Sequence, residues 1–134
     1  MKYLIFTIFL ISFITFLILD AIWLGIISKG FYAKNLSDYL TSDIVWPAAF
    51  IFYLLFNIGL LVFVILPAIE ENSYSTLIMY ALLYGLVTFS TYDLTNLATI
   101  KDWPVIVSVV DIMYGMFVAV VCSSTAFYLH KYLV

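Results

Sequence analysis

Three aspartates interrupt stretches of sequence that are otherwise apolar: Asp20, Asp93 and Asp111. If each stretch is a helix rising about 1.5 Å per residue, each acid lies roughly 9–12 Å inside the same face of the protein. An acidic side chain costs up to about 3.5 kcal/mol at the centre of a membrane helix, and such residues normally face the bundle interior or a wet cavity. Three carboxylates at one depth therefore indicate a site for a proton, a cation or a small ligand, or a set of contacts that joins helices.

Aromatic and amide side chains accompany the three acids. Carboxylate and amide oxygens suit Na⁺, Mg²⁺ or Ca²⁺, and aromatic rings offer apolar walls or a face for an organic cation. If a metal ion binds, we expect Asp20, Asp93 and Asp111 to be its ligands. The sequence predicts that the ligand-binding residues are Asp20, Trp23, Tyr92, Asp93, Asn96, Asp111 and Tyr114.

Helices must position these residues, because four apolar segments each approach the roughly 20 residues that cross a bilayer. The segments are too long for strands and lack the alternation of an outer-membrane barrel. The sequence therefore predicts an all-α, polytopic integral membrane protein, with residues 1–134 forming one domain, a four-helix transmembrane bundle. The expected helices are residues 3–27, 46–69, 75–99 and 104–130.

The connections between these segments differ in length. Short connections at 70–74 and 100–103 predict that the last three helices are antiparallel neighbours. In the longer connection, residues 28–45, apolar residues at helical spacing predict a short amphipathic helix at the membrane interface, with a plain polar loop as the alternative. Trp46 and Trp103 are expected at the same interface, as members of an aromatic belt. The apolar side of the expected interfacial helix is formed by Tyr32, Leu36, Tyr39 and Leu40.

The composition of the 134-residue chain excludes several classes of protein. Mean hydropathy is +1.19 and only 10% of residues are charged, too few to cover a water-soluble domain. The net charge is −3 and arginine is absent, which argues against nucleic-acid binding. Membrane lipids are the expected partners, and a homo-oligomer and a small-molecule or cation ligand are left open. Lysines are nearly balanced between the two sides, so the sequence predicts no orientation in the membrane.

Several motifs occur together in a fixed order along the chain. They are Asp20-x-x-Trp23-Leu-Gly, Phe31-Tyr32, YDLTNLATxxxWP at 92–104 and Asp111-x-x-x-Gly115. In these motifs the whole chain resembles a family of small bacterial membrane proteins known as domain of unknown function 2177. Tyr114 departs from the tryptophan expected in the family but keeps an amphipathic aromatic ring. The resemblance implies a multi-pass, four-helix protein of the bacterial inner membrane and brings no reaction with it.

Three functions remain open on the sequence. The first is an intramembrane pocket, built around three carboxylates, that binds or transports a cation, a proton or a small cationic or lipid-like ligand. The second is a structural or accessory membrane subunit whose acids form a satisfied polar core. The third is an enzyme that modifies lipids or isoprenoids, although HExxH, arginine and a Ser–His pair are absent and His130 is far from the acids. Whether the protein is an enzyme is undecided; the cofactor is unknown, and we expect no haem or di-iron site.

Overall fold

The computed structural model describes residues 2–133, and within them the chain is helical with no strand. Four helical stretches are long and apolar enough to cross a membrane: Lys2–Ile27, Trp46–Glu70, Tyr74–Thr99 and Val105–His130. The predicted fold class, an all-α membrane protein with four transmembrane helices, is thereby confirmed. The elements in chain order are α1 (Lys2–Ile22), η1 (Trp23–Ile27), α2 (Lys29–Asn35), α3 (Trp46–Leu60), η2 (Leu61–Ile65), α4 (Leu66–Glu70), α5 (Tyr74–Thr99) and α6 (Val105–His130).

Local sequence explains where the spanning helices begin and end. Pro47 occupies the first turn of α3, where its missing N–H leaves no hydrogen bond unmade. The Ser73 hydroxyl caps α5 by accepting the Thr76 backbone N–H at 3.2 Å. The two short turns each contain a residue with a positive φ, Asn72 at 47° and Asp102 at 59°. Asn and Asp tolerate this left-handed conformation better than other non-glycine residues, so these turns can be tight.

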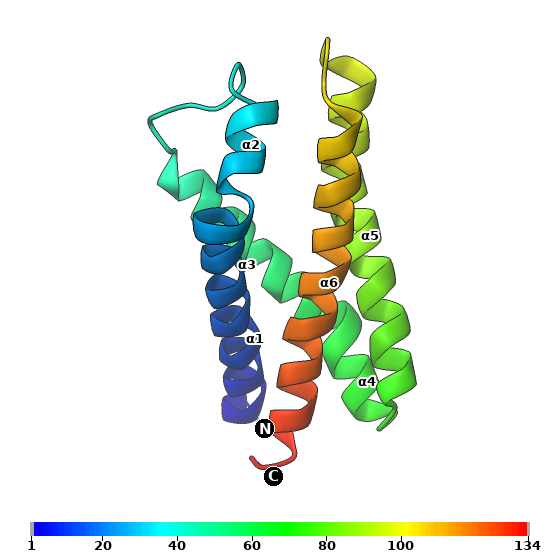
Figure 1. The fold of residues 1–134 in the computed structure, drawn as a ribbon. Coiled ribbons are helices and arrows are strands. Elements are labelled where there is room, and N and C mark those ends of the chain that lie inside the picture. The colour runs from blue at the N-terminus through cyan, green and yellow to red at the C-terminus, as the bar shows by residue number, and fades with distance from the viewer. Residues whose placement is uncertain (1, 134) are drawn as a thin grey trace.

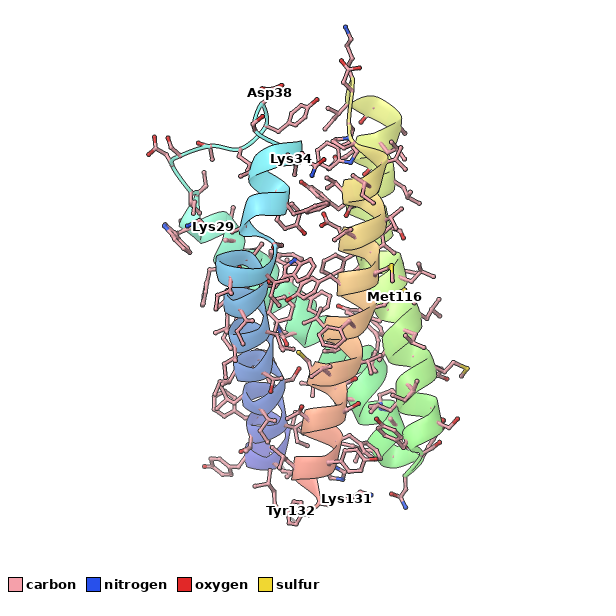
Figure 2. All side chains as sticks on the ribbon, viewed as in Figure 1. Lys29, Lys34, Asp38, Met116, Lys131 and Tyr132 are labelled. Atoms are coloured by element: carbon pink, nitrogen blue, oxygen red, sulfur yellow. The ribbon has the colours of Figure 1, made fainter. Side chains whose placement is uncertain are left out.

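The four spans form an antiparallel bundle with a splayed end. α5 and α6 pack against each other, α1 packs against α6, and α3 crosses behind α1 to reach the other pair through η2 and α4 (Figure 1). The start of α1 and the end of α6 lie at one end of the bundle, while α2 and the α5–α6 turn lie at the other (Figure 1). Polar side chains such as Lys29, Lys34 and Asp38 gather at the α2 end, and Lys131 lies at the opposite end (Figure 2). This distribution suits a bundle whose middle is surrounded by hydrocarbon.

Two spans are interrupted by a π-helical turn, η1 after α1 and η2 after α3. A π-turn holds one more residue than an α-turn, so it rotates the side chains that follow it. η1 ends at Ser28, whose backbone N–H and hydroxyl both donate to the Trp23 carbonyl oxygen, at 2.8 Å and 2.7 Å. η1 thus connects α1, which carries Asp20, to α2, which lies beyond the end of α1 (Figure 1).

Trp103 is not a belt residue, so that prediction is wrong for this position. Its side chain is only 6% exposed, and it packs with Leu36 and Val107 where α2 covers the α5–α6 turn. The indole N–H donates to the Ser108 hydroxyl at 3.1 Å, which satisfies its one polar group inside the protein. Trp46 at the start of α3 is 66% exposed, as a belt residue would be.

Candidate ligand-binding cavity

Asp20 is held by two tyrosines from two other spans. Tyr53 on α3 donates its hydroxyl to Oδ2 of Asp20 at 2.7 Å, and Tyr114 on α6 donates to Oδ1 at 3.3 Å. Both carboxylate oxygens thus have a donor, as a buried charge or polar group requires. Asp20 therefore joins α1, α3 and α6 at one depth.

Removing one of these donors tests whether Asp20 serves as a tie between helices. Tyr53→Phe is expected to lower the free energy of unfolding by about 1–3 kcal/mol, because the Oδ2 atom of Asp20 loses its partner in a partly buried site. The measurement is denaturant or thermal unfolding of the purified protein in lipid or detergent. Tyr80→Phe is the matched control, since the Tyr80 ring is also half-buried and its hydroxyl has no hydrogen-bond partner within residues 2–133. Equal effects of the two substitutions would contradict the tie.

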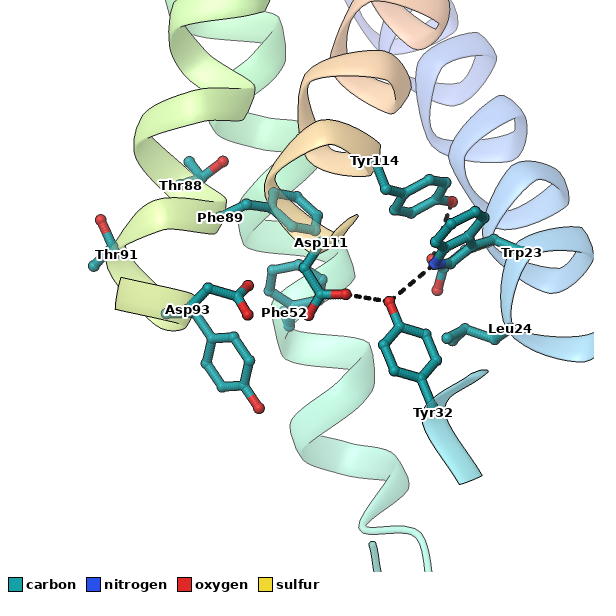
Figure 3. Close-up of a pocket in the computed structure, with 12 residues that line it drawn as sticks. Trp23, Leu24, Tyr32, Phe52, Thr88, Phe89, Thr91, Asp93, Asp111 and Tyr114 are labelled. Carbon is teal, nitrogen blue, oxygen red and sulfur yellow. Dashed lines mark hydrogen bonds between the residues drawn. The ribbon is translucent and has the colours of Figure 1, made fainter. Parts of the chain in front are cut away.

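Asp111 is reached from α2. The Tyr32 hydroxyl donates to Oδ1 of Asp111, and the Trp23 indole N–H donates to the Tyr32 oxygen at 3.2 Å (Figure 3). Burial, and next the hydrogen bond to the Asp111 carboxylate, raise the pKa of Tyr32 above its ordinary value. The phenol therefore stays protonated at neutral pH and remains a donor, which fastens α2 to α6.

Asp93 differs from the other two acids because no hydrogen-bond donor within residues 2–133 satisfies its carboxylate. The residue is 0% exposed, and neither Oδ1 nor Oδ2 has a hydrogen-bond partner among residues 2–133. Its backbone carbonyl oxygen accepts the Ser108 hydroxyl at 3.2 Å, but the carboxyl group instead neighbours that of Asp111 (Figure 3). When both groups are ionised neither can donate, and they repel each other. A buried pair of this kind is stabilised by a shared proton or a bound cation.

A cavity of about 520 Å³ connects the three acids (Figure 3). Its volume is in the range of small-molecule sites, and its walls are mostly aromatic and aliphatic. One wall is the Trp23 ring stacked on Tyr114, with ring centroids 4.3 Å apart and planes 6° apart. The lining residues are Asp20, Trp23, Leu24, Tyr32, Phe52, Thr88, Phe89, Thr91, Tyr92, Asp93, Asp111 and Tyr114.

The same Trp23–Tyr114 stack also borders a second cavity, of about 480 Å³, on its other side. This cavity lies between the first span (α1 and η1) and α6, and no acidic residue lines it. Its remaining lining is aliphatic or aromatic, so its chemistry differs from that of the acidic cavity. The residues that line it are Leu19, Ile22, Trp23, Ile27, Val110, Met113, Tyr114 and Phe117.

Among the residues that the sequence proposed for ligand binding, all except Asn96 line the acidic cavity. Asn96 follows Asp93 by one turn, where α5 turns its Leu97 and Ile100 side chains to the cluster beneath α2. The cavity therefore ends at Asp93 and leaves Asn96 outside. Within residues 2–133 no group of three or more His, Cys, Asp or Glu side chains is placed to hold a metal ion. Asp20 accordingly lines the cavity without joining Asp93 and Asp111 in one ligand set.

Sequence reasoning missed Tyr32, which was assigned to the apolar face of the interfacial helix. Its hydroxyl is instead the donor that connects Trp23 with Asp111. The Phe31-Tyr32 motif was the available signal, but nothing in a linear sequence shows that α2 brings the Tyr32 hydroxyl to Asp111 on α6. The sequence also does not predict that Phe52 and Phe89 line the cavity. Phenylalanine is common throughout the spans, and no motif distinguishes these two from the others.

Comparison with known proteins adds a family but no activity. Residues 5–128 match a family described as "Predicted membrane protein (DUF2177)", which is nearly the whole chain. No curated protein and no solved structure matches the chain. The family description names a membrane location and no substrate, so the function has to be argued from the cavity itself.

Proposed function

Because this chain belongs to the DUF2177 family of predicted membrane proteins, we propose that it acts within the membrane, by binding a small organic cation in the acidic cavity. The observation that carries this proposal is Asp93, a fully buried carboxylate with no hydrogen-bond donor among residues 2–133 and a second acid beside it. A protonated amine supplies both the positive charge and the N–H donors that this pair lacks. The family resemblance supports the bacterial inner membrane as its location.

The lining of the cavity favours an organic cation over a metal ion. Ca²⁺ and Mg²⁺ are held by six or more oxygen ligands, or by fewer with several waters, whereas aromatic rings surround the Asp93–Asp111 pair. The faces and edges of Trp23, Tyr92 and Tyr114 suit the apolar part of an ammonium ion, and aromatic faces attract its charge. No lysine lines the cavity, which disfavours a phosphate group as the bound part of a ligand.

A structural or accessory role is the second candidate, and the contacts of Asp20 favour it for that residue. Tyr53 and Tyr114 satisfy both oxygens of Asp20, so this acid can act purely as a tie between helices. The same explanation fails for Asp93, because an unsatisfied carboxylate weakens a bundle in which it only fills space. We therefore assign ligand binding to Asp93 and Asp111, and positioning of α1, α3 and α6 to Asp20.

Thermal unfolding in the presence of butylamine tests the proposed function. At neutral pH the amine is protonated, and at about one hundred times its dissociation constant it should stabilise the protein by about 2.7 kcal/mol. Butanol has a similar size and no charge, so it should stabilise much less. Asp93→Asn should remove the stabilisation by butylamine, whereas Glu71→Gln, a change at an exposed acid outside the cavity, should retain it. Equal effects of butylamine and butanol, or full binding by Asp93→Asn, would overturn the proposal.

A further inference from the structure

The acidic cavity opens toward the lipid-facing side of the bundle, between α3 and α5. Phe52 on α3 is 46% exposed and Tyr92 on α5 is 59% exposed, and both line the cavity. α3 and α5 diverge toward this end of the molecule (Figure 1). A ligand can thus enter the cavity, which Asp93 and Asp111 line, from the hydrocarbon that surrounds the spans.

A separate apolar groove of about 330 Å³, which shares no lining residue with the cavity, lies farther along α5. On α5 it is lined by residues that precede the cavity residues Thr88 and Thr91 on one face, at intervals of three or four. From Tyr80 to Asp93 this stripe extends about 20 Å along the helix. The opposite wall is formed by Phe63 and Val64 of η2, the element that follows α3. The groove is lined by Phe63, Val64, Tyr80, Leu83, Tyr84 and Val87.

The surface of α5 between the groove and the cavity carries two threonines, Thr88 and Thr91, whose hydroxyl groups donate within the helix. The Thr88 hydroxyl donates to the Tyr84 carbonyl oxygen at 2.7 Å, and the Thr91 hydroxyl donates to the Val87 carbonyl oxygen at 2.6 Å. Each threonine thus satisfies its hydroxyl within α5. The Tyr84 hydroxyl in turn donates to the Phe56 carbonyl oxygen at 2.8 Å. The donor protons of Thr88, Thr91 and Tyr84 are therefore used within the protein along this path, while the Tyr80 hydroxyl at the far end of the groove has no partner within residues 2–133.

From this succession of cavity and groove along α5 we infer that the ligand is an amphiphile, a long-chain alkyl amine whose ammonium group sits at Asp93 and Asp111 and whose tail lies along the α3–α5 seam. The inference rests on the proposed function, since it takes the amine at Asp93 as its starting point. Neither the cavity nor the groove is lined by a lysine, so a head group with a phosphate beside the amine is disfavoured. The acids select the head, and the groove selects the length of the tail.

A substitution that fills the groove tests the contribution of the alkyl tail independently of that of the ammonium group. We propose to measure binding of dodecylamine and butylamine to the protein in nanodiscs of zwitterionic lipid by isothermal titration calorimetry. Val87→Phe adds a ring to the groove and should lower the affinity for dodecylamine about tenfold, the loss typical of an overfilled site, without changing the affinity for butylamine. Leu86→Phe is the matched control, because Leu86 is the exposed neighbour of Val87 and lines neither the groove nor the cavity. Because both variants are measured in the same bilayer, partitioning of dodecylamine into lipid affects both measurements equally and cancels when their affinities are compared.

Each outcome decides between the two proposals. If butylamine binds and Val87→Phe leaves the dodecylamine affinity unchanged, the tail does not use the groove and this inference is wrong, while the proposed function stands. If neither amine binds the wild-type protein, both proposals fail. If Val87→Phe also weakens butylamine, the ring has disturbed the head site. Leu83→Phe, one turn farther from Asp93 in the same groove, then decides in its place by the same criterion.

Discussion

Replacing Asp93 with asparagine is expected to stabilise the unliganded protein and to abolish amine binding. The carboxylate is fully buried, has no donor within residues 2–133 and neighbours the Asp111 carboxyl group. An asparagine of almost the same size removes the repulsion and adds an N–H₂ donor that can face Asp111. Relief of one unsatisfied buried group should raise the free energy of unfolding by about 1–3 kcal/mol. Reversible unfolding of both proteins without ligand measures this gain.

Asp111→Asn is the informative comparison, because Asp111 already has a donor. Its carboxylate accepts the Tyr32 hydroxyl, and a neutral amide oxygen accepts that bond more weakly. We therefore expect Asp111→Asn to gain less stability than Asp93→Asn, although both variants lose affinity for butylamine. A loss of stability in Asp93→Asn would show that the acid is satisfied by a proton or a contact that holds the bundle together, and would favour the structural role.

Gly85→Ala is expected to disrupt the contact between α5 and α6. A Cβ at position 85 would lie 2.4 Å from the Gly115 carbonyl oxygen and 2.6 Å from Cα of Met116. Both are backbone atoms and cannot rotate away, so the helices must separate. Small residues at such crossings allow membrane helices to approach closely. We expect a loss of about 3 kcal/mol in unfolding free energy, at the upper end of overpacking effects, and a still larger loss for Gly85→Leu.

The control for this change is Gly30→Ala, because a Cβ at Gly30 meets nothing within 4 Å. That variant should unfold within about 0.5 kcal/mol of the wild type, as is usual for surface changes. Unfolding in the same detergent compares the two alanines directly. If both variants have wild-type stability, the close approach of α5 to α6 at Gly85 does not contribute to folding.

The spanning helices could be predicted because lipid imposes a simple requirement. A segment that crosses hydrocarbon must satisfy its own backbone and be apolar for about 20 residues, and both conditions are visible in sequence. The observed spans begin and end within about one residue of the expected ranges, a closer agreement than helix termini usually allow. The neighbouring positions of Asp93 and Asp111 could also be anticipated, since counting along two antiparallel helices joined by a short turn places both acids at one depth.

The details of the cavity could not be predicted, because they depend on rotation and tertiary contacts. The spacing of Tyr32 and Leu36 within 28–45 predicts that Tyr32 lies on an apolar face, whereas its hydroxyl binds Asp111. The sequence also predicts that Trp103 is an exposed belt residue, although Leu36 covers it. Whether Asp93 has a donor is likewise a property of its neighbours in space, which its own sequence does not encode.

The Trp23–Tyr114 stack gives the protein an internal optical reporter. Trp23 borders both the acidic cavity and the apolar cavity behind it, while Trp46 is exposed at the start of α3 and Trp103 is enclosed beneath α2. The emission of Trp23 therefore responds to a molecule that enters either cavity. With Trp46 changed to phenylalanine, the two remaining indoles are Trp23 and the enclosed Trp103, so a quencher that reaches the cavity acts mainly on Trp23. Occupancy of the cavity can thus be followed by the fluorescence of Trp23, one of its lining residues.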